Sequence, residues 1–173
     1  MPRADAVSPQ PVLLGLLMSG SRHGYELYQE FGRELGRVWE LGLSKLYAQL
    51  KQLEEAGLVE AQMQPQPSRP ARKVYHLTTE GRAVFLEWVR QPTPYLRHIR
   101  VEFLARLYFF QWLGLDGLDR LVARQQAVCQ EQIERFARLA AETDDPFRHC
   151  VLEFRRGQLE AVMHWLDRCL EIL

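Results

Sequence analysis

The sequence predicts a mainly helical fold, in which a winged helix-turn-helix with a small two-stranded wing precedes an all-helical C-terminal part. Two observations predict it. Proline and glycine recur at short intervals in residues 1–94, whereas residues 96–173 contain one proline, Pro146, and long periodic segments. Within the first part, three helical patterns precede two strand patterns and a further helix. We therefore expect two domains, residues 8–92 and residues 96–173.

Apolar residues at helical spacing predict two helices near the start of the chain. The first begins after Ser8, a residue type that caps helix N-termini, and ends near Gly20. The second covers residues 24–35, in which leucine and phenylalanine recur every four residues. Each has one apolar face, so we expect both to pack against other elements of the first domain.

A third helix is predicted over residues 44–56, with Ser44 as its N-cap and Gly57 at its end. Leucines at helical spacing form its buried stripe, and they are Leu46, Leu50 and Leu53. Polar and small residues are left on the opposite face, and they are Lys45, Ala48, Gln49 and Gln52. This helix therefore has a face that is free to contact a ligand.

Two strands, at residues 58–63 and 73–77, enclose a loop with three prolines and form the wing. No acidic residue lies between Glu60 and Glu80, and the segment contains Arg69, Arg72 and Lys73. The wing therefore has a net charge of +3, although the whole chain has 22 Lys and Arg against 22 Asp and Glu. Its positive charge lies where a winged helix meets phosphate groups.

The remaining elements are helices. One is capped by Thr78 or Thr79 and ends near Arg90, and three more are expected over residues 99–113, 116–141 and 146–173. Gln125 and Gln132 interrupt the apolar pattern of the middle one. In the last helix, apolar residues recur about every 3.5 positions, as in a coiled coil. We expect this stripe to form a homodimer interface, through Leu152, Leu159, Val162, Leu166 and Leu170.

Three short helices followed by a basic hairpin predict binding to double-stranded DNA, since the third helix of a winged helix enters the major groove. Glutamine can pair with adenine, lysine can donate to guanine, and alanine allows close approach. We therefore expect bases to be read by Lys45, Ala48, Gln49 and Gln52. Phosphates are expected to meet Ser44, Tyr47, Lys51, Arg69, Arg72 and Lys73. The alternative is a helical adaptor whose winged helix binds protein instead of DNA.

Four segments, in order, resemble the PadR family of bacterial transcriptional regulators. They read LGLL at 14–17, HGYEL at 23–27, LYAQLKQLEEAGLV at 46–59 and KVYHLTTEGR at 73–82. The tail resembles the helical C-terminal domain of the longer, virulence-activator subgroup, through FRRG at 154–157 and WLD at 165–167. The chain departs from the family at 43–45, where LSK replaces a turn that often contains proline and glycine.

The resemblance implies a homodimeric regulator, which we expect to be a repressor that binds a palindromic operator. It places Tyr47 at the DNA backbone and assigns the dimer to the C-terminal helices. It also implies a phenolic or drug-like effector. Aromatic residues that would stack on such a ligand are Trp88, Tyr95, Phe103, Tyr108 and Trp112. The alternative, that the same rings form the core of a dimer, is the one we favour.

Catalytic apparatus is not predicted. The five histidines lack metal-ligand spacing, and the chain has neither a phosphate-binding glycine loop nor a Gly-x-Ser-x-Gly elbow. We therefore expect no enzyme activity, no cofactor and no metal. Three cysteines are too few for a disulfide scaffold, and no segment predicts a signal peptide or a membrane span, so a cytoplasmic protein is expected.

Overall fold

The computed structural model describes residues 7–65 and 71–173. Its elements, in chain order, are α1 (Gln10–Leu16), the 3-10 turn η1 (Leu17–Ser19), β1 (Arg22–His23), α2 (Gly24–Leu35), α3 (Leu43–Glu55), β2 (Val59–Gln64), β3 (Arg72–Leu77), α4 (Thr79–Val89), α5 (Leu96–His98), the π-helical η2 (Ile99–Phe103), α6 (Leu104–Leu113), α7 (Leu118–Ala141) and α8 (Pro146–Ile172). The predicted fold class, a winged helix-turn-helix followed by helices, is confirmed.

The sheet has one more strand than the sequence predicted. Its order is β1-β3-β2, and β1 pairs antiparallel with β3 through Arg22 opposite Tyr75 and His23 opposite Val74. The β2–β3 hairpin forms the wing, with Val59 opposite Leu77 at its base. A strand of two residues is too short to show the alternation by which strands are recognised in a sequence.

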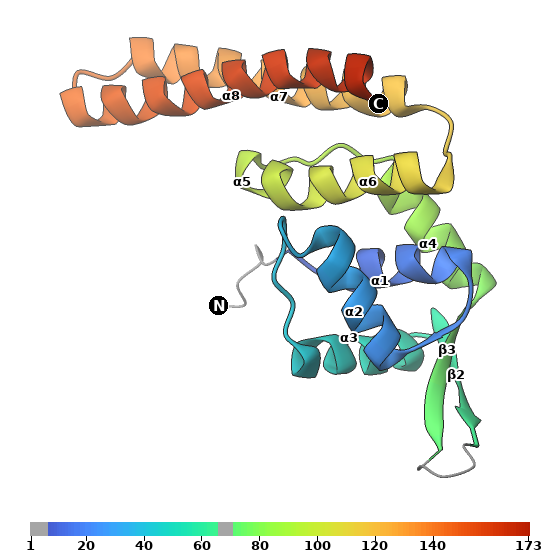
Figure 1. Ribbon diagram of the computed structural model, residues 1–173. Coiled ribbons are helices and arrows are strands. Elements are labelled where there is room, and N and C mark those ends of the chain that lie inside the picture. Colours follow the sequence, from blue (N-terminus) through green and yellow to red (C-terminus); the bar gives the residue numbers. More distant parts are fainter. Residues whose placement is uncertain (1–6, 66–70) are drawn as a thin grey trace.

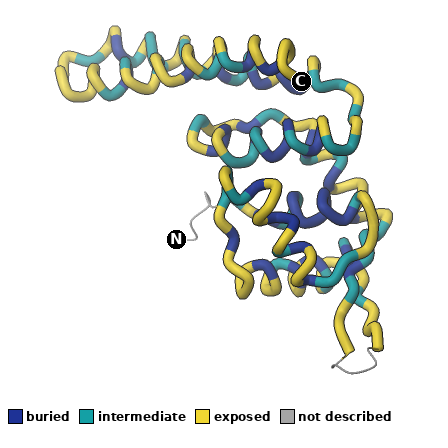
Figure 2. The backbone as a smooth tube through the Cα atoms, in the orientation of Figure 1, coloured by how far each residue is buried: buried dark blue, intermediate teal, exposed yellow. Residues whose placement is uncertain are grey.

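The elements form layers (Figure 1). α3 and the β2–β3 hairpin lie at one end of the molecule, and the antiparallel pair α7–α8 lies at the other. α5 and α6 lie between this pair and the winged helix. The pair extends beyond α5, and its far end is largely exposed, as Figure 2 shows.

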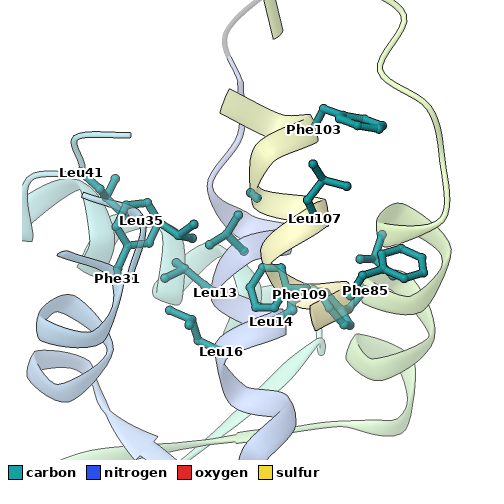
Figure 3. Packing of buried hydrophobic residues seen from close by; sticks show 14 of the residues in the cluster. Leu13, Leu14, Leu16, Phe31, Leu35, Leu41, Phe85, Phe103, Leu107 and Phe109 are labelled. Atoms are coloured by element: carbon teal, nitrogen blue, oxygen red, sulfur yellow. The ribbon is translucent and has the colours of Figure 1, made fainter. Parts of the chain in front are cut away.

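The core of the winged helix surrounds α1, whose Leu13, Leu14 and Leu16 are fully buried (Figure 3). Phe85 of α4 and Phe109 of α6 meet edge to face, with ring centroids 5.1 Å apart. These two rings cover α1 at Gly15, where an added Cβ would lie 2.5 Å from Phe109 and 2.6 Å from Phe85. The core therefore continues from the winged helix into α6.

The helix caps differ in part from the expectation. Thr78 caps α4, because its Oγ1 accepts a hydrogen bond from the Gly81 amide at 3.0 Å. Ser44 lies inside α3, whose N-cap is Gly42 without a side-chain hydrogen bond. The N-cap of α1 is Pro9, one residue after the predicted Ser8. The actual start of α3 leaves its first amides available to a ligand.

A buried polar network joins α4, the linker after it, α6 and α7. Arg106 of α6 is only 3% exposed, and its Nε donates to the Trp88 carbonyl at 3.0 Å. Its guanidinium also donates to Thr93 Oγ1 and, at 3.4 Å, to Glu102. Gln125 of α7 binds both backbone groups of Thr93, at 2.6 and 3.0 Å. Burial lowers the pKa of Arg106 to about 10.

The two glutamines that interrupt the apolar pattern of α7 therefore have a structural reason. Gln132 Nε2 donates to the Pro94 carbonyl at 2.7 Å, next to the residue that Gln125 binds. Both side chains hold the linker between α4 and α5 against α7.

In the residues that the structure covers, no helix is long and apolar enough to cross a membrane, and no cluster of His, Cys, Asp and Glu has the form of a metal site.

We predict that Gly15→Ala lowers the free energy of unfolding by about 1–3 kcal/mol, because the rings of Phe85 and Phe109 are buried and cannot move away from the new methyl group. Gly32→Ala in α2 is the matched control, since an added Cβ there meets nothing within 4 Å. It is expected to raise stability by about 0.5–1 kcal/mol. Urea titration followed by circular dichroism measures both, and equal effects would contradict the packing described.

Candidate nucleic-acid interface

One face of α3 is fixed inside the protein and the other is presented to solvent. Leu46, Leu50 and Leu53 are fully buried, as predicted. The predicted contact residues on the helix that are exposed are Ser44, Lys45, Tyr47, Ala48, Lys51 and Gln52, and Gln49 is half-buried. Because the wing lies at the same end of the molecule, α3 and the hairpin form one surface (Figure 1).

Gln52 is held by the start of α1. Its Oε1 accepts a hydrogen bond of 2.9 Å from Nε2 of Gln10. The contact fixes which way the Gln52 amide points, and it places Gln10 beside the recognition face. Sequence reasoning missed Gln10, because the two residues are 42 positions apart and nothing in the pattern of α1 marks it.

Tyr47 lies against the first residue of α2. An added Cβ at Gly24 would be 2.4 Å from Cε1 of the Tyr47 ring, so only glycine at this position leaves room for the ring. The preceding His23 caps α2, because its Nδ1 accepts from the Glu26 amide at 3.2 Å while Glu26 accepts from the His23 amide at 3.1 Å. Tyr47 remains 43% exposed, with its ring between α2 and solvent.

The wing is attached to α3 by an ion pair. Lys73 of β3 lies 2.9 Å from Glu54, and this hydrogen bond raises the pKa of Lys73. Arg72 donates to Gln64 on the opposite strand at 3.3 Å. Arg69, the third predicted cation of the wing, lies outside the described residues. The wing is therefore braced against the helix that it flanks.

Ion pairs reduce the positive charge of this surface. Lys51 lies 3.6 Å from Glu55, four residues along α3, and Lys73 is paired with Glu54. Among the described lysines and arginines of α3, only Lys45 has no carboxylate at ion-pair distance. The Lys51 pair follows from helical spacing, whereas the Lys73 pair depends on how the hairpin folds back and was not predicted.

The leucines expected at a dimer interface pack inside the chain instead. Leu159 and Leu166 are fully buried and Leu152 nearly so, because α7 and α8 lie side by side. Val162 is half-buried and only Leu170, at 46% exposure, is largely open. The helix that this stripe needs as its partner is α7 of the same chain.

The predicted aromatic residues do not gather around one pocket. Tyr108 and Trp112 stack with centroids 5.6 Å apart, and Phe109 links them to Trp88. Burial raises the pKa of Tyr108 to about 12, and its buried hydroxyl has no hydrogen-bond partner among the described residues. The two remaining rings lie elsewhere: Phe103 contacts Trp165, and Tyr95 contacts His98.

Comparison with known proteins matches both parts of the chain. Residues 13–87 match the Transcriptional regulator PadR-like family, and residues 99–173 match the Virulence activator alpha C-term family. The chain belongs to the PadR-like family. That family is one of transcriptional regulators, and none of the helices described for this chain could cross a membrane.

Two curated relatives show how far the similarity extends. This PadR-like regulator is 31% identical over 113 residues to the negative transcriptional regulator PadR of Bacillus subtilis, covering 65% of this chain and 62% of that protein. It is 33% identical over 84 residues to the probable transcriptional regulator Rv1176c of Mycobacterium tuberculosis. That alignment covers 49% of this chain and 44% of the relative. The alignments therefore span about half to three fifths of the relatives' own length.

A solved structure on operator DNA shows the same fold. The B. subtilis PadR structure in complex with operator DNA has a TM-score of 0.51 and 22% identity, and covers 98% of this regulator and 99% of that chain. A structure of the same B. subtilis protein in complex with p-coumaric acid has a TM-score of 0.44 and 22% identity. It covers 96% of this chain and 98% of that chain.

We predict that Gly24→Ala displaces the Tyr47 ring and lowers the free energy of unfolding of this PadR-like regulator by about 1 kcal/mol. In a Tyr47→Ala background the same substitution should change stability by less than about 0.5 kcal/mol, because the clash has been removed. A double-mutant cycle in urea gives both values. An identical cost in the two backgrounds would show that Tyr47 does not occupy the space above Gly24.

Proposed function

We propose that this PadR-like regulator binds a palindromic operator as a homodimer and represses transcription. The observation that carries the proposal is the polar face of α3, exposed beside the wing while three buried leucines fix the helix. A helix held in this way can enter the major groove as a rigid unit. The B. subtilis relative is a negative regulator with a structure on operator DNA, which supports the same role here.

Base reading is assigned to the exposed centre of α3. Lys45 and Ala48 are exposed and Gln49 is half-buried beside them, so these three residues can reach base edges in the groove. Gln52 is oriented by Gln10, and its amide NH₂ group stays available to donate to a base while Oε1 accepts from Gln10. We assign the sequence preference to these four side chains.

Phosphate contacts are assigned to residues around that face: Ser44, Tyr47, Lys51, Arg69, Arg72 and Lys73. Exposed ion pairs such as Lys73–Glu54 are worth only about 0–1 kcal/mol, so a phosphate can replace the carboxylate at small cost. In the free protein Glu55 and Glu54 offset the charges of Lys51 and Lys73. We therefore expect modest affinity for non-specific DNA, and strong binding only when both subunits of a dimer contact one operator.

Alanine substitutions in the wing and on α3 test the proposed DNA contacts. Arg72→Ala and Lys73→Ala should weaken binding to every sequence and each lower the slope of log K against log salt concentration by about 1. Gln49→Ala should instead reduce the ratio of the affinity for operator DNA to the affinity for scrambled DNA. Arg124→Ala, an exposed cation on α7, is the matched control and should change neither. Fluorescence anisotropy on a labelled fragment of its own promoter measures these effects.

Two outcomes would contradict the proposal. Unchanged affinity and salt slope in both wing variants would remove the wing from the interface. Complete absence of operator binding by the unmodified protein would favour the alternative class, an adaptor whose winged helix binds protein.

An effector site is the remaining part of the proposal. We assign it to the Trp88, Tyr108 and Trp112 cluster, because the buried Tyr108 hydroxyl has no partner within residues 7–65 and 71–173 and its ring stacks on Trp112. p-Coumaric acid is the probe, since the B. subtilis relative has been solved with it. It should release operator DNA and quench tryptophan fluorescence, and Tyr108→Phe should weaken that response several-fold. Normal release from Tyr108→Phe protein would exclude a contact with this hydroxyl.

A further inference from the structure

The side chain of Gln52 is bonded to another element of the winged helix. Its Oε1 accepts a hydrogen bond of 2.9 Å from Nε2 of Gln10, which lies 42 residues earlier in the chain. Gln52 is exposed on α3, one turn after Ala48 and Gln49, so the three residues are neighbours on the helix surface. A residue of α1 is therefore in contact with the face that the proposed function assigns to base reading.

Gln10 is held more firmly than Gln52. It is the first residue of α1 and lies between Pro9 and Pro11, whose rings fix the backbone angle φ on either side of it. Pro9 is buried, and so is every residue from 12 to 17. Gln10 itself is half-buried, whereas Gln52 is an exposed side chain that can rotate. We therefore expect Gln10 to direct the amide of Gln52, and not the reverse.

This bond decides which half of the Gln52 amide is left for DNA. A glutamine amide has an acceptor, Oε1, and a donor, the Nε2 amino group, and the two point in different directions from one planar group. Because Oε1 is turned towards Gln10, the amino group is left for other partners. A glutamine without such a bond can turn its amide over, or pair both halves with adenine. Gln52 is therefore set as a donor.

A donor in this position prefers bases that present acceptors in the major groove. Guanine presents N7 and O6 there, and thymine presents O4, whereas cytosine presents the donor N4. Adenine presents an acceptor beside a donor, so it is fully matched only by a glutamine whose Oε1 is free to face it. The fixed amide of Gln52 therefore favours guanine or thymine at the base that it meets, and disfavours cytosine most.

We propose that Gln10 is a specificity-determining residue, which acts through Gln52 and makes that side chain read guanine or thymine at one position of each half-site. The inference rests on the proposed function, because it requires that α3 reads bases. Gln10 needs no contact with DNA for this role. In water a hydrogen bond of this kind favours one orientation of the amide by about two- to tenfold. Exclusion of water at the DNA interface strengthens that preference.

Gln10→Glu tests the proposal by reversing the bond without a change on α3. A carboxylate only accepts, so Gln52 must turn its amino group towards it and present Oε1 to DNA. The preferred base at that position should change to one with an exocyclic amino group, adenine or cytosine, and the ratio of affinities should shift about three- to tenfold. Gln10→Met removes the bond at similar side-chain volume, and should weaken the preference without reversing it.

Base preference is measured by competition binding of the full chain to DNA duplexes built on a fragment of its own promoter, with one position varied at a time. The new negative charge of Gln10→Glu lowers the affinity for all duplexes alike, so the ratio between bases is the quantity compared. Gln130→Glu is the matched control, because Gln130 is an exposed glutamine of α7 that donates to Glu134 at 3.0 Å, at the opposite end of the molecule from α3 (Figure 1). It should leave every ratio unchanged within about twofold. Circular dichroism checks that each variant is folded.

A Gln52→Ala background separates the possible outcomes. A reversal in Gln10→Glu that disappears in this background supports the inference. The same reversal with Gln52 removed would overturn it, since Gln10 would then contact a base directly. Unchanged preference in Gln10→Glu, or full preference in Gln52→Ala alone, would also overturn it while leaving operator binding by α3 intact. An unmodified protein that binds every duplex equally would overturn both this inference and the proposed function.

Discussion

The linker between α4 and α5 is held by side chains that come from both sides of it, and the arrangement of the two parts depends on this contact. Arg106 fixes the end of α4 through the Trp88 carbonyl, while Gln125 and Gln132 bind the backbone at Thr93 and Pro94. A buried guanidinium and a buried amide are costly to leave unpaired, so the network favours a single arrangement of α4, α6 and α7. The wing and the α7–α8 pair therefore have a defined relative direction.

The fold could be predicted from the sequence wherever a pattern is local. Residues 24–35, predicted as a helix, are α2, and the wing strands and long C-terminal helices lie within a few residues of their expected bounds. Contacts between distant residues could not be predicted in this way. The two-residue strand β1, the Lys73–Glu54 pair and the Gln52–Gln10 bond each join segments that only the folded chain brings together.

The glutamines of α7 and the leucines of α8 show the limit of periodicity. Gln125 and Gln132 looked like defects in an apolar stripe, yet they bind the linker. Leu159 and Leu166 have the correct spacing for a helical partner, but the spacing cannot tell whether that partner is in the same chain. The burial of both leucines between α7 and α8 shows that the partner is in the same chain.

In the proposed homodimer, the buried contacts of the linker connect each winged helix rigidly to the dimer, so the two α3 helices have a fixed separation. The most direct test inserts base pairs between the half-sites of the operator and measures affinity by anisotropy. Insertion of 5 base pairs should abolish tight binding, and insertion of about 10, one helical turn, should restore part of it because both half-sites again face the protein. Equal affinity for all three spacings would contradict the account, since it would show that each winged helix binds independently.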